Sequence, residues 1–170
     1  MLTLILGGAR SGKSTRALSL AKGRVLFVAT AEALDEEMAA RIAAHKAERP
    51  AGWDTLEEPR HIARALRAKG GGYDTVIIDC LTLWVGNLIE GGGTPAEWVA
   101  PLLAAYQANK SDWVVISNEV GLGIVPDNQL ARRYRDALGV VNQLVAEAAD
   151  RVTLMVAGIG LEIKAKPRSD

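Results

Sequence analysis

The sequence predicts an α/β fold in which a mainly parallel sheet is covered by helices on both faces. Two observations support this fold class: short runs rich in Val, Ile and Leu recur along the chain, and helical patterns separate them. The runs are continuously apolar, as strands buried on both faces require. They lie at 2–6, 24–29, 74–79, 112–117 and 152–157, and 160–164 is expected to return as a C-terminal edge strand.

Length and composition limit the class of protein. A chain of 170 residues can bury a substantial core, so we expect a single domain over residues 1–170. Twenty Lys and Arg balance twenty Asp and Glu, so no net charge favours nucleic acid as a partner. The lone cysteine, Cys80, excludes an internal disulfide and fits a reducing compartment. Neither a secretory leader nor a membrane-spanning run is visible, so we expect a cytoplasmic protein.

The first apolar run leads into a phosphate-binding motif. In "LTLILGGARSGKST" at 2–15, the pattern G-x-x-x-x-G-K-[ST] is matched by Gly7, Gly12, Lys13 and Ser14. In this motif backbone N–H groups surround phosphate oxygens, the lysine reaches the β- and γ-phosphates, and the hydroxyl holds Mg²⁺. A helix predicted from Lys13 adds the positive end of its dipole. The sequence therefore predicts a nucleoside triphosphate site with Lys13 as a catalytic residue.

A second helix is predicted from about Leu34 to Glu48. Its first turn is acidic, its last turn is basic, and Pro50 follows, which is the charge order and the stop that a helix dipole favours. At helical spacing, Met38 and Ile42 share one face with Leu34 and with a histidine discussed next.

That histidine, His45, has Arg41 and Arg49 one turn before and one turn after it. A lone histidine on an apolar helix face is usually a hydrogen-bonded core residue. Alternatively, the two arginines keep the imidazole neutral and attract phosphate, and a neutral imidazole near a nucleotide can act as a covalent catalyst. His61 has no such setting, and we expect it only to begin a helix.

Asp79 ends the apolar run 74–79. Ligands of open α/β sheets bind at the carboxyl ends of strands, so this carboxylate is a candidate contact for Mg²⁺ or nucleotide, together with Ser14 as the second metal ligand. The alternative is a turn or helix N-cap residue.

The segment 116–143 follows another predicted strand end. Its glycines and Pro126 indicate a loop, and Asp127 or Asn128 can cap the helix that follows. An acid, an amide and three guanidinium groups of this segment, those of Arg132, Arg133 and Arg135, could bind a second phosphate-bearing substrate. The candidate residues for this role are Glu119, Arg132 and Arg135. The alternative is a solvated helix face with the acid in an ordinary turn.

Together these motifs resemble a known family, the bifunctional adenosylcobinamide kinase / adenosylcobinamide-phosphate guanylyltransferases of cobalamin synthesis and salvage. The resemblance extends over nearly the whole chain. It rests on "GGARSGKS" at 7–14, "VAT" at 28–30, "DEEMAARIAAHKAERP" at 35–50, "WDTLEEP" at 53–59, "DCLTLWVGNL" at 79–88, "SNEVGLGIVPDNQLARRYRDALGVVNQ" at 117–143 and "VAGI" at 156–159.

The resemblance implies a RecA-like P-loop NTPase fold and two reactions. In the first, ATP or GTP phosphorylates the aminopropanol hydroxyl of adenosylcobinamide. In the second, GTP gives GMP to His45 and then to adenosylcobinamide phosphate. The family also implies Mg²⁺ and a small ring-like homo-oligomer, a trimer. Its nucleotide contacts carry over to Gly7, Gly8, Ala9, Arg10, Ser11, Gly12, Lys13, Ser14, Thr30, Ala31, Glu32, Lys46, Ala47, Glu48, Arg49, Glu57 and Asp79.

Two other functions stay open from the sequence. One is a P-loop small-molecule kinase without nucleotidyl transfer, in which His45 is structural. The other is a non-enzymatic RecA-like nucleotide-binding module, for which an exposed segment 81–89 would contact a partner.

Overall fold

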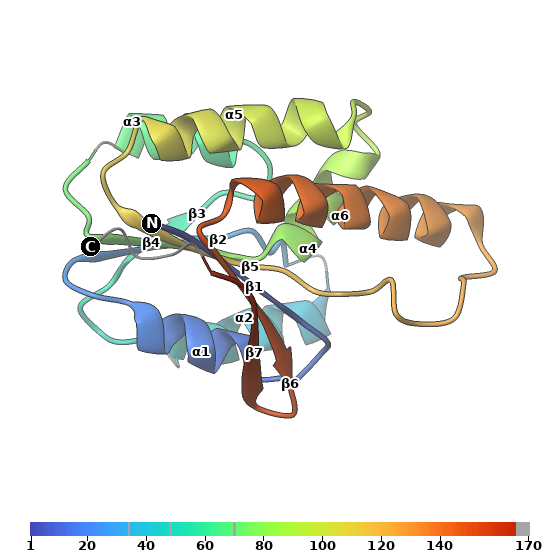
Figure 1. The fold of residues 1–170 in the computed structure, drawn as a ribbon, viewed down its shortest axis with the longest axis horizontal. Helices are drawn as coiled ribbons and strands as arrows, with labels where there is room; N and C mark the ends of the chain where they lie inside the picture. The colour runs from blue at the N-terminus through green and yellow to red at the C-terminus, as the bar shows by residue number, and fades with distance from the viewer. Residues whose placement is uncertain (34, 48, 70, 166–170) are drawn as a thin grey trace.

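A computed structural model of the chain describes residues 1–33, 35–47, 49–69 and 71–165. Its strands form one sheet in the order β3-β2-β4-β5-β1-β6-β7 (Figure 1). Every neighbouring pair is parallel except β6 and β7, which are antiparallel. The strands are β1 Leu2–Gly7, β2 Val25–Ala29, β3 Asp54–Glu57, β4 Thr75–Asp79, β5 Asp112–Ile116, β6 Arg151–Val156 and β7 Ile159–Ala165. The predicted mainly parallel sheet with a C-terminal edge strand is confirmed.

Helices cover both faces of this sheet, as predicted (Figure 1). One face carries α1 Lys13–Leu20 and α2 Glu36–Ala47, and the other carries α3 Ile62–Lys69, α4 Leu81–Ile89, α5 Pro95–Gln107 and α6 Gln129–Ala148. Side chains of one strand alternate between two cores: Leu4 packs on the side of α3 to α6, and Ile5 packs on the side of α1. Burial on both faces explains why the strands read as continuous apolar runs.

The helix predicted over 34–48 is α2, although Leu34 and Glu48 lie outside the described residues. The backbone N–H of Met38 donates to a carboxylate oxygen of Asp35 at 2.7 Å, which caps the start of the helix. None of the described residues of α2 is buried, and Met38 and Ile42 are only half-buried. The apolar face predicted for this helix is therefore only partly covered by the rest of the protein.

Helix α4 belongs to the interior of the molecule. Leu81, Trp84, Val85 and Ile89 are buried in it, and the Trp84 indole donates to the Arg60 carbonyl at 2.9 Å. The alternative in which 81–89 forms an exposed partner surface is therefore wrong.

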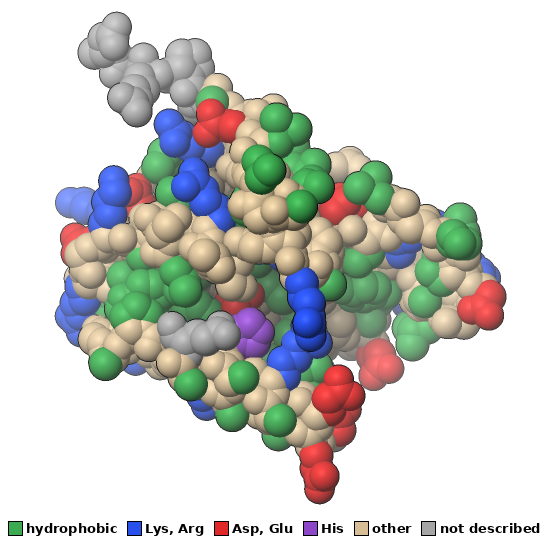
Figure 2. All heavy atoms as spheres, turned by 90° about the horizontal axis from the view of Figure 1, so that it is seen from below, with side chains coloured by type: hydrophobic (Ala, Val, Ile, Leu, Met, Phe, Trp, Pro, Cys, Tyr) green, Lys and Arg blue, Asp and Glu red, His purple; other side chains and the backbone are tan. Residues whose placement is uncertain are grey.

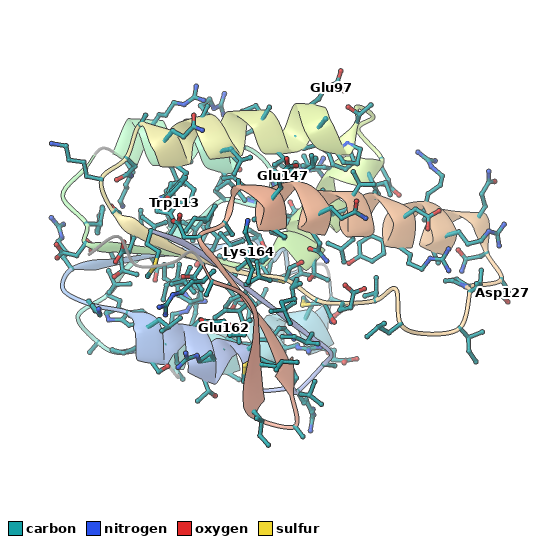
Figure 3. All side chains as sticks on the ribbon, viewed as in Figure 1. Glu97, Trp113, Asp127, Glu147, Glu162 and Lys164 are labelled. Atoms are coloured by element: carbon teal, nitrogen blue, oxygen red, sulfur yellow. The ribbon has the colours of Figure 1, made fainter. Side chains whose placement is uncertain are left out.

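The edge strand β7 is tied to the far end of α6. Lys164 donates to the carbonyls of Ala146 and Glu147 at 2.8 and 2.7 Å, and Figure 3 shows Lys164 and Glu147 on neighbouring elements. A cation at this position satisfies the last carbonyls of the helix. Among the described residues, no helix is long and apolar enough to cross a membrane.

Candidate active site

The carboxyl ends of the parallel strands meet at one edge of the sheet, and the phosphate loop follows β1 there. Gly7 has φ +149°, and a Cβ at this position would lie 2.5 Å from the Met155 carbonyl oxygen. Gly12 has φ +95°, and its Cβ would lie 3.2 Å from the Cα of Gly158. The loop thus passes so close to β6 at Gly7 and to the β6–β7 turn at Gly12 that only glycine fits at both positions.

The start of α1 can bind an anion through its backbone N–H groups. Gly12 caps the helix without a side-chain hydrogen bond, and the first turn contains no acidic residue. The first backbone N–H groups therefore stay available to a phosphate. Ser11 is buried, and its hydroxyl has no hydrogen-bond partner among the described residues, while its carbonyl accepts from Gly158 N–H at 3.0 Å.

Lys13 lies over this loop. Its Nζ donates to the Gly8 carbonyl at 2.6 Å. Burial lowers the pKa of Lys13, while the charge of Asp79 acts in the opposite direction. The lysine is therefore within electrostatic reach of the carboxylate that ends β4, as the sequence interpretation requires.

Asp79 is the electrostatic centre of the site. Burial raises the pKa of this carboxyl, and the charges of His45, Arg49 and Lys13 oppose the rise. One carboxylate therefore interacts with the loop lysine, with His45 of α2 and with Arg49 just beyond that helix. Figure 2, which looks onto the face that carries α1 and α2, shows a histidine side chain beside acidic and basic side chains in a hollow of that face.

Arg49 is held firmly next to this carboxylate. Its guanidinium carbon lies 4.0 Å from the centre of the Phe27 ring, and its Nη1 donates to the Thr55 hydroxyl at 3.4 Å. Burial lowers the pKa of Arg49, opposed by the charges of Asp79 and Glu57. Its Nε is buried and has no hydrogen-bond partner among the described residues. A buried donor of this kind is suited to an anionic ligand.

His45 is half-buried, on a helix with no buried residue among those described, so it is not a core histidine. Its neighbour Lys46 forms an ion pair with Glu57 of β3. This ion pair attaches the end of α2 to β3, the strand at the edge of the sheet.

The remaining predicted nucleotide contacts have different surroundings in the structure. The buried Thr30 hydroxyl donates to the Cys80 carbonyl and accepts from the Cys80 N–H, both at 2.8 Å, so it holds the turn after Asp79. Glu32 pairs with Arg60 at 3.8 Å. The small or exposed residues Gly8, Ala9, Arg10, Ala31 and Ala47 offer backbone or surface groups, and Glu48 lies outside the described residues.

Glu119 lies beside the phosphate loop, because its N–H donates to the Gly7 carbonyl at 3.4 Å. One oxygen of its carboxylate accepts from Gly121 N–H at 2.8 Å. Arg132 donates to the carbonyls of Pro126 and Asp127 at 2.9 and 2.7 Å.

Arg135 pairs with the neighbouring Asp136 at 3.0 Å. Within the described part of the chain, no hydrogen bond or ion pair joins either arginine to the phosphate loop. The helix α6 that carries both is capped by Asn128, whose side chain accepts from Ala131 N–H at 2.7 Å. Of the two predicted caps, the asparagine is therefore the one used.

Sequence reasoning missed a group of polar residues behind Glu119. Ser117, directly after β5, and Asn142 in α6 are both buried, and the serine hydroxyl donates to the Asn142 Oδ1 at 2.7 Å. Tyr134 donates to the Thr82 carbonyl at 3.1 Å, and burial raises the pKa of this phenol to about 12. The sequence feature that could have indicated this cluster is Asn142, a polar residue among the buried apolar positions of α6.

The donor set fits a magnesium ion. Mg²⁺ in nucleotide sites is bound by one or two protein oxygens, phosphate oxygens and water. Ser14 follows Lys13 in the first turn of α1, and the charge of Asp79 acts on that lysine, so a hydroxyl and a carboxylate are available near the phosphate loop. Among the described residues, no group of three or more His, Cys, Asp or Glu could hold a metal ion.

Comparisons with known proteins identify the family to which the chain is similar. Residues 3–163 match the family model described as "Cobinamide kinase / cobinamide phosphate guanyltransferase". Over a 181-residue alignment the chain is 44% identical to the bifunctional adenosylcobalamin biosynthesis protein CobU of Salmonella typhimurium, covering 96% of this chain and 100% of that protein. It is 41% identical to CobU of Escherichia coli, with the same coverage. It is 44% identical to CobP of Pseudomonas aeruginosa, covering 98% of this chain and 99% of that protein.

A solved structure with a similar fold is the flagellar accessory protein FlaH of Methanocaldococcus jannaschii. Its TM-score is 0.55 at 13% identity, covering 97% of this chain and 78% of that chain, so the likeness concerns the fold alone. The family match spans most of the chain, and the CobU and CobP relatives align with it almost from end to end. The chain belongs to the cobinamide kinase / cobinamide phosphate guanyltransferase family.

Proposed function

We propose that this protein phosphorylates the aminopropanol hydroxyl of adenosylcobinamide and then transfers GMP from GTP to the phosphorylated product through His45. The observation that carries the proposal is the shared carboxylate. Asp79 interacts with Lys13 of the phosphate loop, with His45 of α2 and with Arg49, which lies two residues beyond that helix, so one bound triphosphate can be handled by both sets of residues.

In the kinase step, the substrate hydroxyl oxygen attacks the γ-phosphorus of ATP or GTP and the nucleoside diphosphate leaves. Lys13 and the N–H groups at the start of α1 neutralise the charge that develops on the phosphate oxygens. Glu119, next to Gly7, orients or deprotonates the attacking hydroxyl. A magnesium ion held by Ser14 and Asp79 would supply charge neutralisation on the phosphates.

In the transfer steps, an unprotonated nitrogen of His45 attacks the α-phosphorus of GTP, and pyrophosphate leaves. The phosphate of the second substrate then attacks the same phosphorus, which releases the histidine and forms adenosylcobinamide-GDP. Arg49, whose buried Nε lacks a partner among the described residues, stabilises charge on the α-phosphate with help from Lys46. The covalent intermediate lets pyrophosphate depart before the bulky corrinoid binds.

We also propose that the chain works in the cytoplasm, where nucleoside triphosphates are supplied, as a homo-oligomer of the trimeric kind that the resemblance suggests. Large apolar side chains stay exposed on the loop after β5 and on the β6–β7 hairpin, and a second copy would cover such surfaces. They are Leu122, Ile124, Val125, Val156, Ile159, Leu161 and Ile163. Sedimentation equilibrium tests this assembly, and a purely monomeric protein would refute it.

The enzymatic proposal is tested with GTP labelled on the α-phosphate. Wild-type protein incubated with this GTP and Mg²⁺ should acquire label that is labile in acid and stable in alkali, as a phosphohistidine-type bond is. The variant His45→Ala should acquire none and still phosphorylate cobinamide from ATP. Wild-type protein that phosphorylates cobinamide without labelling would reduce the function to the kinase alone, and absence of both activities would favour the binding module.

A further inference from the structure

Three residues, 117–119, connect β5 to the exposed loop that follows. Ser117 N–H donates to the Ile5 carbonyl at 2.9 Å, and Glu119 N–H donates to the Gly7 carbonyl at 3.4 Å. The chain therefore runs beside β1 as far as the first glycine of the phosphate loop. From Leu122, three residues later, the chain is exposed: Leu122 is 84% and Ile124 is 98% exposed, and the loop extends outward to Asp127 before α6 begins (Figure 3).

Asn142 clamps this connecting segment from α6. Its Oδ1 accepts from the Ser117 hydroxyl at 2.7 Å, and its Nδ2 donates to the Asn118 carbonyl at 3.0 Å. Ser117 is 0% and Asn142 is 5% exposed. A buried amide is costly unless both of its ends are bonded, and here both ends bind consecutive residues of one segment. The side chain therefore fixes the backbone immediately before Glu119.

A second contact ties the same segment to the strand of Asp79. The N–H of Asn118 donates to the Thr82 hydroxyl at 2.9 Å, and Tyr134 of α6 donates to the Thr82 carbonyl at 3.1 Å. Thr82 lies in the first turn of α4, and this helix begins two residues after Asp79, the last residue of β4. The polar cluster thus joins the two strand ends that carry the carboxylates of the site.

We propose that Asn142 is a positioning residue for the kinase step, holding Glu119 beside the phosphate loop where the acceptor hydroxyl must bind. This inference rests on the role proposed above for Glu119. Transfer of GMP to His45 involves no hydroxyl acceptor, so it does not need Glu119. Loss of the clamp therefore impairs phosphorylation of cobinamide and spares GMP loading of the enzyme.

The variant Asn142→Asp keeps the oxygen that accepts from Ser117 and removes the N–H that donates to Asn118. We expect its kinase kcat to fall by about tenfold or more, with the KM for ATP and the rate of GMP loading within about twofold of wild type. Ser117→Ala should give a smaller loss of the same kind, and it serves if the aspartate variant does not fold. Val145→Ala is the control: it shortens a buried side chain of the same helix, and it should lower Tm without changing the ratio of the two activities.

Glu119→Gln completes the test. It should lower the kinase rate by itself, and adding Asn142→Asp to it should lower the rate no further, because the two residues act through one group. Equal loss of kinase and GMP loading in Asn142→Asp would show a general structural role and overturn the inference. So would an unchanged kinase in Asn142→Asp when Glu119→Gln is impaired. An unimpaired Glu119→Gln would refute the role proposed for Glu119 and, with it, this inference, while leaving the two activities in place.

Discussion

Replacement of Arg49 by methionine should slow GMP transfer far more than phosphorylation. In the structure the guanidinium stacks on Phe27 at 4.0 Å and lies within electrostatic reach of Asp79, on the same side of the site as His45. Methionine keeps most of the apolar length of the side chain and removes the charge. The variant therefore tests whether the positive charge of Arg49 stabilises the α-phosphate during GMP transfer.

The stability cost follows from the stacking. A partly buried cation–π contact is worth about 1–2 kcal/mol. In a domain of this size each kcal/mol changes Tm by roughly 2–4 °C, so a fall of about 2–8 °C is expected. Loss of one preorganised donor at a developing oxyanion lowers a rate by about 10²–10³. GMP loading should fall by that factor, and the kinase rate should fall by less than about tenfold, because Lys13 serves the γ-phosphate.

The assay measures GMP loading and cobinamide phosphorylation at a temperature well below Tm. Arg24→Met is a matched control, since Arg24 stacks on Tyr73 at 4.6 Å and pairs with Asp54 at 2.9 Å where β2 begins, at the opposite end of that strand from the site. It should lose stability and keep both rates. GMP loading at the wild-type rate in Arg49→Met, or an equal loss of both activities, would refute this reasoning.

Three further changes have defined outcomes. Lys13→Ala should lower kinase turnover by about two orders of magnitude, whereas Lys22→Ala, just beyond α1, should not; unchanged turnover would exclude the loop from the mechanism. Burial raises the pKa of Asp79, so the stability associated with its protonated form is lost as pH rises through that pKa. Asp79→Asn should remove this decline and raise Tm at pH 8 while both activities fall; a lower Tm would contradict the sign. Gly7→Ala should lower the unfolding free energy by about 1–3 kcal/mol through its clash with Met155, as measured by urea titration.

The sequence predicts the sheet well because burial on both faces leaves a local signature. The strands β1, β2, β4, β5 and β6 are mainly apolar runs, and the phosphate loop is defined by spacing within eight residues. The strand β3 lacks that signature, because Asp54–Glu57 pairs only with β2 and alternates between half-buried and exposed residues. Helix α4 is hard to recognise because its apolar residues continue directly from those of β4.

Which residues meet in the site depends on the order of the strands in the sheet, and local sequence patterns do not give that order. His45 and Asp79 are far apart in the sequence, and they approach because β2, which precedes α2, lies next to β4 in the sheet. The family resemblance supplies a role for His45, whereas the stacking of Arg49 on Phe27 follows only from the fold. Asn142 is similar: its two partners lie directly after β5, and a sequence shows only a polar residue on an apolar helix face.

The most direct test of the account is to locate the covalently bound nucleotide. Protein incubated with Mg²⁺ and GTP is digested under alkaline conditions, and its peptides are sequenced by mass spectrometry. We predict GMP on one residue, His45, and its disappearance when cobinamide phosphate is added. GMP on any other residue, or guanylylation of cobinamide phosphate without a covalently modified enzyme, would contradict the account.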